Sequence, residues 1–370
     1  MQLQTPSRTG WQLIGWDAEH GLSLTLGHRD RLLLIELEAR DEHRDCFART
    51  ARFNLCVRHP FLSGEPLSAE ERQVMQQVVS VVRGREALLP TFERPSPTRR
   101  SEIREVNVER LLIRESEGQY YLNPYSGCMI GCEFCYVAHR ADFSRALQGL
   151  PSLPWGRYVD VKVNAAEVLR DEVKRNPPGL VRFSPIVTDP YQPLERRYRI
   201  TRQCLEVLLE AGFSPVVLTR AARVTEDFEL LSRFEQASVG FSIPTDDEHV
   251  RLTFEPGADP IEERLEALAR AHESGLSTFA VVQPMLPMNA ERLLARLAPL
   301  VRAARIDRMY ELPRSRTLYE SIGRVDAMEP AWFDTTGATL RRGFAAAGVA
   351  VDDLDDLGEL VGRPWSRHEP

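Results

Sequence analysis

The sequence predicts an α/β protein whose main part is a partial (β/α)6 barrel, preceded by a small N-terminal α+β domain. Three observations support this prediction. With 370 residues, the chain exceeds one ordinary domain of ~150 residues but falls short of three. From about residue 119, short β-type runs alternate with amphipathic helical stretches. The content of 43% hydrophobic and 27% charged residues is typical of a globular protein and excludes disordered, collagenous and coiled-coil chains.

The first part of the chain, residues 1–90, contains short apolar runs followed by one expected helix. The β-type runs are 22–26, 32–37 and 53–57. Ser68 and Glu71 form a capping-box signature for a helix that ends at Gly84. A stretch rich in proline and charge then begins. We therefore expect an α+β domain over 1–90 and a linker over 91–118.

The expected barrel core spans residues 119–315. Its β-type runs are 119–122, 158–163, 181–187, 215–219, 238–243 and 278–282, with helical stretches near 164–175, 200–211, 225–234 and 260–274. This alternation predicts parallel strands with right-handed crossovers. Because a full eight-unit barrel needs ~250 residues, a partial TIM-like barrel fits these units better. We expect a further strand over 309–312 and a C-terminal helical extension over 316–370.

Charge and hydropathy narrow the expected partners. The net charge is −7, so a basic coat for nucleic acid is absent, and duplex DNA is not an expected partner. The longest aliphatic runs, 32–35 and 78–82, are far shorter than the ~18 residues of a membrane span. We therefore expect a cytoplasmic protein without a membrane partner.

Three of the six cysteines lie within eight positions, as Cys128, Cys132 and Cys135. Six cysteines are too few for a disulfide framework, and such crowding in a reducing compartment indicates metal or redox chemistry. The segment follows a β-type run, so it is expected at the carboxyl ends of the strands, where active sites collect. Gly127 and Gly131 allow the backbone to curl around a bound object. Three thiolates would hold three corners of an iron–sulfur cube and leave one iron open.

A zinc site is the main alternative for these cysteines. With His139 they would form a Cys3His set, which is a legitimate structural zinc site. Their spacing matches the usual paired zinc-ligand spacing poorly, and the other cysteines lie too far away in sequence to complete a ferredoxin-like site. The open-site cluster is therefore the favoured interpretation, and a zinc-stabilised, non-catalytic binding module is the alternative.

The C-x3-C-x2-C pattern, with Phe134 just before the third cysteine, resembles the signature of the radical S-adenosylmethionine (SAM) superfamily. The opening N-P-Y-x-G-C narrows the resemblance to the spore photoproduct lyase-like branch. Further blocks that agree with this branch are 188–195, 201–206 and 255–265. The resemblance covers about residues 105–315.

The resemblance implies an enzyme with two cofactors, a 4Fe–4S cluster on the three cysteines and SAM at the open iron. A one-electron donor such as a flavodoxin or ferredoxin would reduce the cluster. Cleavage of SAM would then give a 5′-deoxyadenosyl radical that abstracts hydrogen from an unidentified substrate. Photoproduct lyase itself uses a cysteine near the third strand, where this chain has none, so repair of a DNA photoproduct is not expected.

The resemblance also implies residues that contact SAM. Phe134 and Tyr136 match aromatic positions near the adenine and the reacting centre. Ser184 and Ser242 match polar positions that bond to the ribose and methionine portions. Arg220 lies where relatives usually have lysine, and it offers a planar fork instead of a point charge to the SAM carboxylate.

Polar residues after the third β-type run are further candidates. Asp189 and Tyr191 are catalytic candidates, and Gln192 and Glu195 are substrate-binding candidates, because all four are expected at the mouth of the sheet. The alternative is a polar loop held by its own turns, with Glu195 paired to a following arginine. Cys204 is a third catalytic candidate, although a buried thiol on a helix usually packs as a small hydrophobic group.

Overall fold

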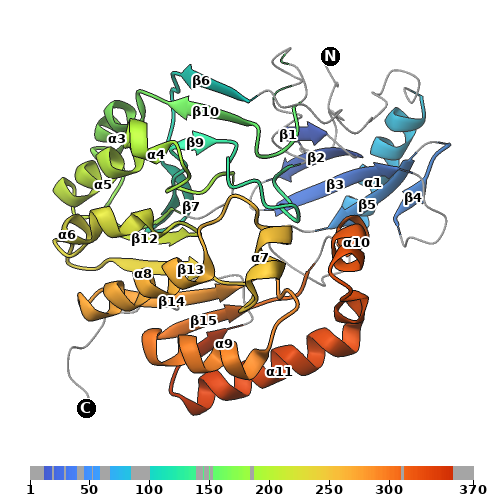
Figure 1. Ribbon diagram of the computed structural model, residues 1–370. Coiled ribbons are helices and arrows are strands. Elements are labelled where there is room, and N and C mark those ends of the chain that lie inside the picture. The colour runs from blue at the N-terminus through green and yellow to red at the C-terminus, as the bar shows by residue number, and fades with distance from the viewer. Residues whose placement is uncertain are drawn as a thin grey trace. The chain divides into compact units, whose positions relative to one another are not determined.

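The chain folds into two compact units in the computed structural model (Figure 1). The first contains Met1–Thr98 and Val137–Leu153, and the second contains Arg99–Tyr136 and Pro154–Pro370. The structure describes residues 12–18, 21–28, 31–39, 46–51, 53–58, 67–84, 101–138, 145, 150, 153–183, 187–309 and 312–352. Within these ranges, every helix is too short or too polar to cross a membrane.

The first unit combines a five-stranded antiparallel sheet with one helix. Its strands are β1 (Gln12–Ala18), β2 (Gly21–His28), β3 (Arg31–Ala39), β4 (Ala48–Arg49) and β5 (Phe53–Arg58), in the order β1-β2-β3-β5-β4. Helix α1 (Ala69–Arg83) begins with the expected capping box of Ser68 and Glu71. Alternate residues of β3, such as Leu33 and Ile35, pack with Val74 of α1 in a buried core.

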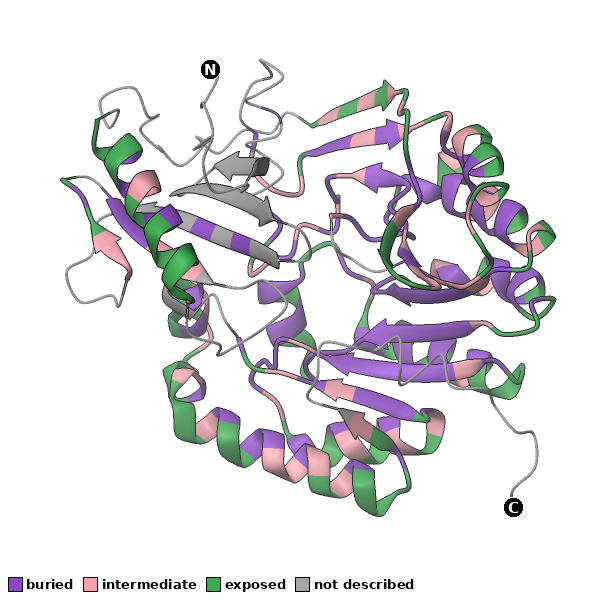
Figure 2. Ribbon diagram, turned by 180° about the vertical axis from the view of Figure 1, so that it is seen from behind, coloured by how far each residue is buried: buried purple, intermediate pink, exposed green. Residues whose placement is uncertain are grey.

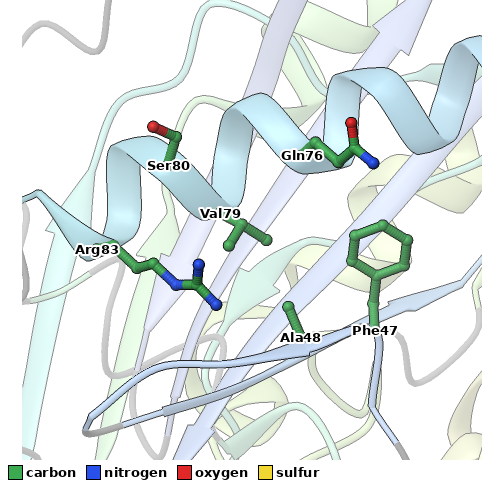
Figure 3. Close-up of a pocket in the computed structure, with 6 residues that line it drawn as sticks. All are labelled: Phe47, Ala48, Gln76, Val79, Ser80 and Arg83. Atoms are coloured by element: carbon green, nitrogen blue, oxygen red, sulfur yellow. The ribbon is translucent and has the colours of Figure 1, made fainter.

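A cavity of about 450 Å³ lies in the first unit beside α1 (Figure 3). Its lining residues are Phe47, Ala48, Gln76, Val79, Ser80 and Arg83. The Nη2 atom of Arg83 donates a hydrogen bond of 3.1 Å to the Arg49 carbonyl. None of the candidate residues from the sequence lines this cavity.

The second unit is built on an eight-stranded sheet. Its strands, in spatial order, are β16 (Ala350–Asp352), β15 (Ala303–Ile306), β14 (Ser277–Val282), β13 (Ser238–Ser242), β12 (Ser214–Thr219), β11 (Leu180–Phe183), β8 (Gln119–Tyr121) and β7 (Ile113–Ser116). Neighbours from β8 to β16 are parallel, and β7 is antiparallel to β8. The predicted α/β class with a parallel sheet is therefore confirmed.

Helices connect these strands and lie along one side of the sheet, as α5, α8, α9 and α11 show in Figure 1. The helices are α3 (Ala165–Val173), α4 (Glu195–Tyr198), α5 (Ile200–Glu210), α6 (Phe228–Leu231), α7 (Glu248–Phe254), α8 (Ile261–Glu273), α9 (Ala290–Leu297), α10 (Leu312–Ser321) and α11 (Pro330–Ala346). This arrangement is typical of parallel sheets with crossover connections.

Both faces of the central strands are buried, as the purple strands of Figure 2 show. Val217 of β12 packs into the large core that includes the helices. Val216 and Leu218, its neighbours in sequence, point to the opposite face and pack with Phe279 and Val281 of β14. Continuous apolar strands are expected where helices cover one face and the curved sheet encloses the other.

The second β-type run does not join this sheet, which corrects the expected order of six strands. β10 (Tyr158–Lys162) pairs in parallel with β6 (Glu102–Val106) and antiparallel with β9 (Tyr125–Ser126). β8 pairs directly with β11, and the Leu122 amide extends this pairing by donating to the Arg182 carbonyl at 3.0 Å. Because β8 pairs directly with β11, β10 cannot lie between these two strands.

Two other expectations differ from the structure. The strand expected over 309–312 lies partly outside the described residues, and of its described residues Met309 is irregular and Leu312 begins α10. β15 and β16 extend the parallel sheet instead. The segment 91–118 was expected to be a linker, yet it contains β6 and β7, which pair with strands of the second unit.

A glycine on β13 makes room for an aromatic side chain on β14. Gly240 lies directly opposite Phe279, and a Cβ built on Gly240 would come within 2.1 Å of the Phe279 Cε2 atom. Gly240→Ala should therefore lower the free energy of unfolding by about 1–3 kcal/mol, the usual cost of overpacking. Chemical denaturation measures this loss. In a Phe279→Ala background the cost should shrink; an equal cost in both backgrounds would show that the ring is not its cause.

Candidate functional site

The cysteine loop lies where the carboxyl ends of four neighbouring parallel strands meet. It follows β8 and the short strand β9, and Asp189 and Arg220 follow β11 and β12. Ser242 ends β13, the next strand of the sheet. The structure thus brings together residues from separate parts of the sequence, at the edge of the sheet where β/α proteins place their active sites.

Two glycines shape the cysteine loop, as the sequence predicts. Gly127 and Gly131 adopt positive φ angles of 90° and 63°, a conformation that favours glycine. A Cβ on Gly127 would lie 2.4 Å from the Tyr158 carbonyl oxygen, and a Cβ on Gly131 would lie 3.1 Å from the Cα of Gly156. The loop therefore packs closely against the neighbouring backbone at both positions.

Gln192 holds the first half of the loop. Its Oε1 accepts a hydrogen bond of 3.0 Å from the Met129 amide, and its Nε2 donates to the Gly127 carbonyl at 3.3 Å. Thr188 donates to the same carbonyl at 2.7 Å and accepts from Nε2 of Gln192, also at 2.7 Å. The Gln192 side chain is fully buried, and its amide group forms hydrogen bonds with the backbone of the cysteine loop.

The second half of the loop is held by the segment that follows α7. The Gly257 amide donates to the Ile130 carbonyl at 3.0 Å, and the Glu133 amide donates to the Phe254 carbonyl at 2.9 Å. A Cβ on Gly257 would lie 2.6 Å from the Ile130 carbonyl oxygen, which explains a glycine at this close approach. The cysteine loop is therefore fixed from both sides.

Apolar surroundings favour the neutral form of two of the three thiols. Cys128 and Cys132 are buried with Ile130 and Ala258 in a small hydrophobic cluster. Burial, together with nearby Asp189, raises the pKa of the Cys128 thiol to about 12. Burial also raises the pKa of Cys132, although the charge of Arg220 opposes this shift. Because metals bind thiolates, loading of this site must release protons.

The arrangement of the three thiols differs from that of a site for a single metal ion. Within the described ranges, no three His, Cys, Asp or Glu side chains form a group that could hold one metal ion. A cube does not need such a group, because each cysteine binds a different iron. His139, the fourth ligand in the zinc alternative, lies outside the described residues.

Asp189 fixes the start of the segment that carries Arg220. Its Oδ1 accepts hydrogen bonds from the Thr219 hydroxyl at 2.6 Å and the Tyr191 amide at 2.9 Å. Its Oδ2 accepts from the Arg220 amide at 2.8 Å. Burial raises the pKa of Asp189, and these three hydrogen bonds oppose that shift. The carboxyl group therefore acts on the backbone where β12 ends.

Arg220 belongs to a buried charged network. Its Nε donates to Oε1 of Glu255 at 2.5 Å, and its guanidinium lies 5.8 Å from the centre of the Phe134 ring. Arg264 donates from Nη1 to Oε2 of Glu255 at 3.0 Å and to the Ser242 carbonyl at 2.8 Å. The structure thus places Arg220, Phe134 and Ser242 in one site.

Several buried polar atoms in this region have no hydrogen-bond partner among the residues that the structure describes. They are Oγ of Ser242, Nε and Nη2 of Arg264, and Oδ1 of Asn123. Buried polar groups are normally paired, and an unpaired one costs about 1–3 kcal/mol. Unused hydrogen-bonding capacity at the carboxyl ends of the strands suits a polar ligand such as SAM.

The other candidate residues have structural partners or lie at the surface. Tyr191 is buried and donates to Oδ2 of Asp227 at 2.9 Å. Cys204 is fully buried in the core, and burial raises its pKa. Tyr136 is 49% exposed, and Ser184 lies outside the described residues. Direct roles in catalysis or SAM binding stay predictions for these residues.

Sequence reasoning assigned no role to Glu255, Arg264 or Thr188. The first two were visible as part of the block 255–265, and Thr188 as part of the block 188–195. Nothing in the sequence shows that Glu255 pairs with two arginines from different loops and helices. The signal that could have identified it is a glutamate among apolar residues, since a buried carboxylate requires partners.

Glu195 caps α5 and holds the start of the cysteine segment. Its Oε2 accepts from the Tyr125 hydroxyl and from the Thr201 amide at 3.1 Å, and its Oε1 accepts from the Arg202 amide at 3.2 Å. The sequence also allowed an ion pair between Glu195 and a following arginine side chain. The structure instead shows a hydrogen bond from the backbone amide of Arg202. Burial raises the pKa of Glu195 to about 7, against the lowering effect of these hydrogen bonds.

This raised pKa predicts a pH-dependent stability. Between about pH 4.5 and 7 the folded state keeps the Glu195 proton that the unfolded state has lost, so stability should fall as pH rises. The wild-type protein should lose up to about 3 kcal/mol relative to Glu195→Gln across this range. Urea denaturation of both proteins at several pH values measures the difference. Parallel pH profiles would contradict the shift.

Comparison with known proteins places the chain in a family. The model of the radical SAM superfamily matches residues 122–297. A protein of Acidianus two-tailed virus without an assigned function is 32% identical over 222 residues, which cover 55% of this chain and 73% of that protein. A relative from Pseudomonas phage M6, named a radical SAM Nalpha-GlyT isomerase, is 28% identical over 44% of this chain and 32% of its own length.

Solved structures with a similar fold have low sequence identity. Spore photoproduct lyase complexed with dinucleoside spore photoproduct has a TM-score of 0.47 at 15% identity, covering 67% of this chain and 81% of that chain. SuiB of Streptococcus suis, bound to precursor peptide SuiA, has a TM-score of 0.37 at 12% identity, covering 70% and 52%. The family match, together with the cysteine pattern on the anchored loop, shows that the chain belongs to the radical SAM superfamily of enzymes.

Proposed function

We propose that Cys128, Cys132 and Cys135 hold a 4Fe–4S cluster and that SAM binds at the iron without a cysteine ligand. The observation that carries this proposal is the three-cysteine loop, with Cys128 and Cys132 buried and Cys135 half-buried, fixed from one side by Gln192 and from the other by Gly257. A loop held in this way presents its thiols in one arrangement and lowers the entropic cost of binding a rigid cube.

The bound cluster and SAM would supply a 5′-deoxyadenosyl radical that removes hydrogen from an organic substrate. The residues of the chain would bind and orient SAM. Arg220 is available to the carboxylate through Nη1 and Nη2, which have no partner among the described residues. The unpaired Ser242 hydroxyl is available to another polar group of SAM. The apolar cluster around Cys128 would keep water from the reacting centre.

The substrate is proposed only as an organic molecule with a hydrogen that the radical can abstract. The names of the two solved structures mention different molecules, a dinucleoside photoproduct and a peptide, so they do not indicate one class of substrate. The net charge of −7 argues against duplex DNA. We propose a small one-electron donor protein, such as a flavodoxin or ferredoxin, as reductant and the cytoplasm as the compartment. The non-catalytic zinc module is not favoured, since the family consists of enzymes.

Removing one cysteine ligand tests the proposal. Cys132→Ala should lower the iron and acid-labile sulfide bound after anaerobic reconstitution by at least tenfold, because changes even in residues behind a metal ligand cost about 10–100-fold in affinity. It should also abolish 5′-deoxyadenosine formation with dithionite as reductant. Colorimetric iron and sulfide assays, electron paramagnetic resonance (EPR) and chromatography measure these changes.

Cys46→Ala is the matched control, because Cys46 is a free thiol in the first unit. This variant should load iron and sulfide like the wild-type protein. Zinc without sulfide in the wild-type protein would refute the proposed function. A Cys132→Ala protein that still cleaves SAM would refute the assignment of this ligand.

A further inference from the structure

Glu255 uses both carboxylate oxygens to join two arginines inside the protein. Oε1 accepts from Nε of Arg220 at 2.5 Å, and Oε2 accepts from Nη1 of Arg264 at 3.0 Å. Glu255 and Arg264 have no exposed surface, and Arg220 is 9% exposed. The three side chains come from different elements: the end of α7, helix α8, and the segment after β12.

Both ends of this network are tied to the backbone. Nη1 of Arg264 also donates to the carbonyl of Ser242, so Glu255 is fixed relative to the end of β13. The amide of Arg220 donates to Asp189, which fixes the start of the arginine at the end of β12. Arg220 is therefore held at its backbone and at Nε, and its guanidinium lies over Phe134.

The network carries more positive than negative charge. Two guanidinium groups face the single carboxylate of Glu255, while Asp189 and Cys132, whose pKa values burial raises, are the other acidic groups near Arg220. Nη1 and Nη2 of Arg220 have no partner in the described ranges, and Nε and Nη2 of Arg264 are buried and unpaired. An anion at Arg220 would complete the hydrogen bonding and balance the charge.

Stability alone does not account for this arrangement. Replacing a buried Arg–Glu–Arg set by apolar residues is often neutral or stabilising, because desolvation of the charges offsets their attraction. Arg264 in particular stays partly unsatisfied while fully buried. An arginine binds a carboxylate through two parallel hydrogen bonds only when its plane is fixed, and Glu255 fixes that plane through Nε.

We propose that Glu255 is a positioning residue: it holds Arg220 so that Nη1 and Nη2 receive the carboxylate of SAM. Arg264 acts behind it by holding Glu255 in place. This inference rests on the proposed function and extends it, because it names the residue that sets the affinity for one group of the cofactor.

The experiment compares two ligands on the reconstituted protein. Glu255→Asp keeps the charge but shortens the side chain by one methylene, so Arg220 should lose its fixed plane. Its affinity for SAM should fall about tenfold, the usual effect of disturbing a residue behind a ligand contact. Its affinity for decarboxylated SAM, which lacks the carboxylate, should equal that of the wild type. Equilibrium dialysis measures both, with iron content as a check on loading.

Glu262→Asp provides the control, because it shortens a glutamate of α8 whose ion pair with Arg296 is exposed. It should bind both ligands like the wild type. If Glu255→Asp is unstable, a double-mutant cycle tests the inference instead. The lysine of Arg220→Lys lacks Nε, so in that background Glu255→Gln should change SAM affinity much less than it does in the wild type.

Equal affinity of wild type and Glu255→Asp for SAM would overturn the positioning role. Equal losses for SAM and decarboxylated SAM would also overturn it, since they indicate a general structural effect. Additive effects of the two substitutions in the double-mutant cycle would likewise overturn the positioning role. Failure of the wild-type holoprotein to bind SAM at all would instead refute the proposed function itself.

Discussion

The site depends on how the backbone of the cysteine loop is held. Gln192 bonds to it from the segment after β11, and Gly257 bonds to it from the segment after α7. These two segments reach the same loop because the parallel strands of the sheet end at one edge. A three-residue ligand set on one short loop needs such support, since the loop has no regular structure of its own.

The polar groups around this loop divide into two kinds. Asp189, Gln192 and Glu195 each make hydrogen bonds to backbone groups and so fix the geometry. Within the described part of the chain, Arg220 and Ser242 keep unpaired atoms at the carboxyl ends of β12 and β13. The hydrogen bonds of Asp189, Gln192 and Glu195 explain why these polar residues lie buried. The unpaired atoms of Arg220 and Ser242 are where a polar cofactor would find partners.

Features that depend on a local sequence pattern could be predicted from the sequence. Helical spacing predicted α8, the capping box predicted the start of α1, and the two glycines beside the cysteines predicted the tight curvature of their loop. Pairing between distant segments was not predictable, since the pattern of β10 is equally compatible with the main sheet and with β6. The role of Glu255 was hidden for the same reason: its partners Arg220 and Arg264 meet it only after folding.

The central claim is that the three-cysteine cluster leaves one iron to which SAM binds directly. Electron–nuclear double resonance of the reduced, reconstituted protein, with SAM labelled by ¹⁷O in its carboxylate and ¹⁵N in its amine, tests this claim. Both labels should couple to the cluster, because both groups would coordinate the open iron. A reduced cluster that shows neither coupling while SAM is bound, or whose fourth iron carries a side chain of the protein, would contradict it.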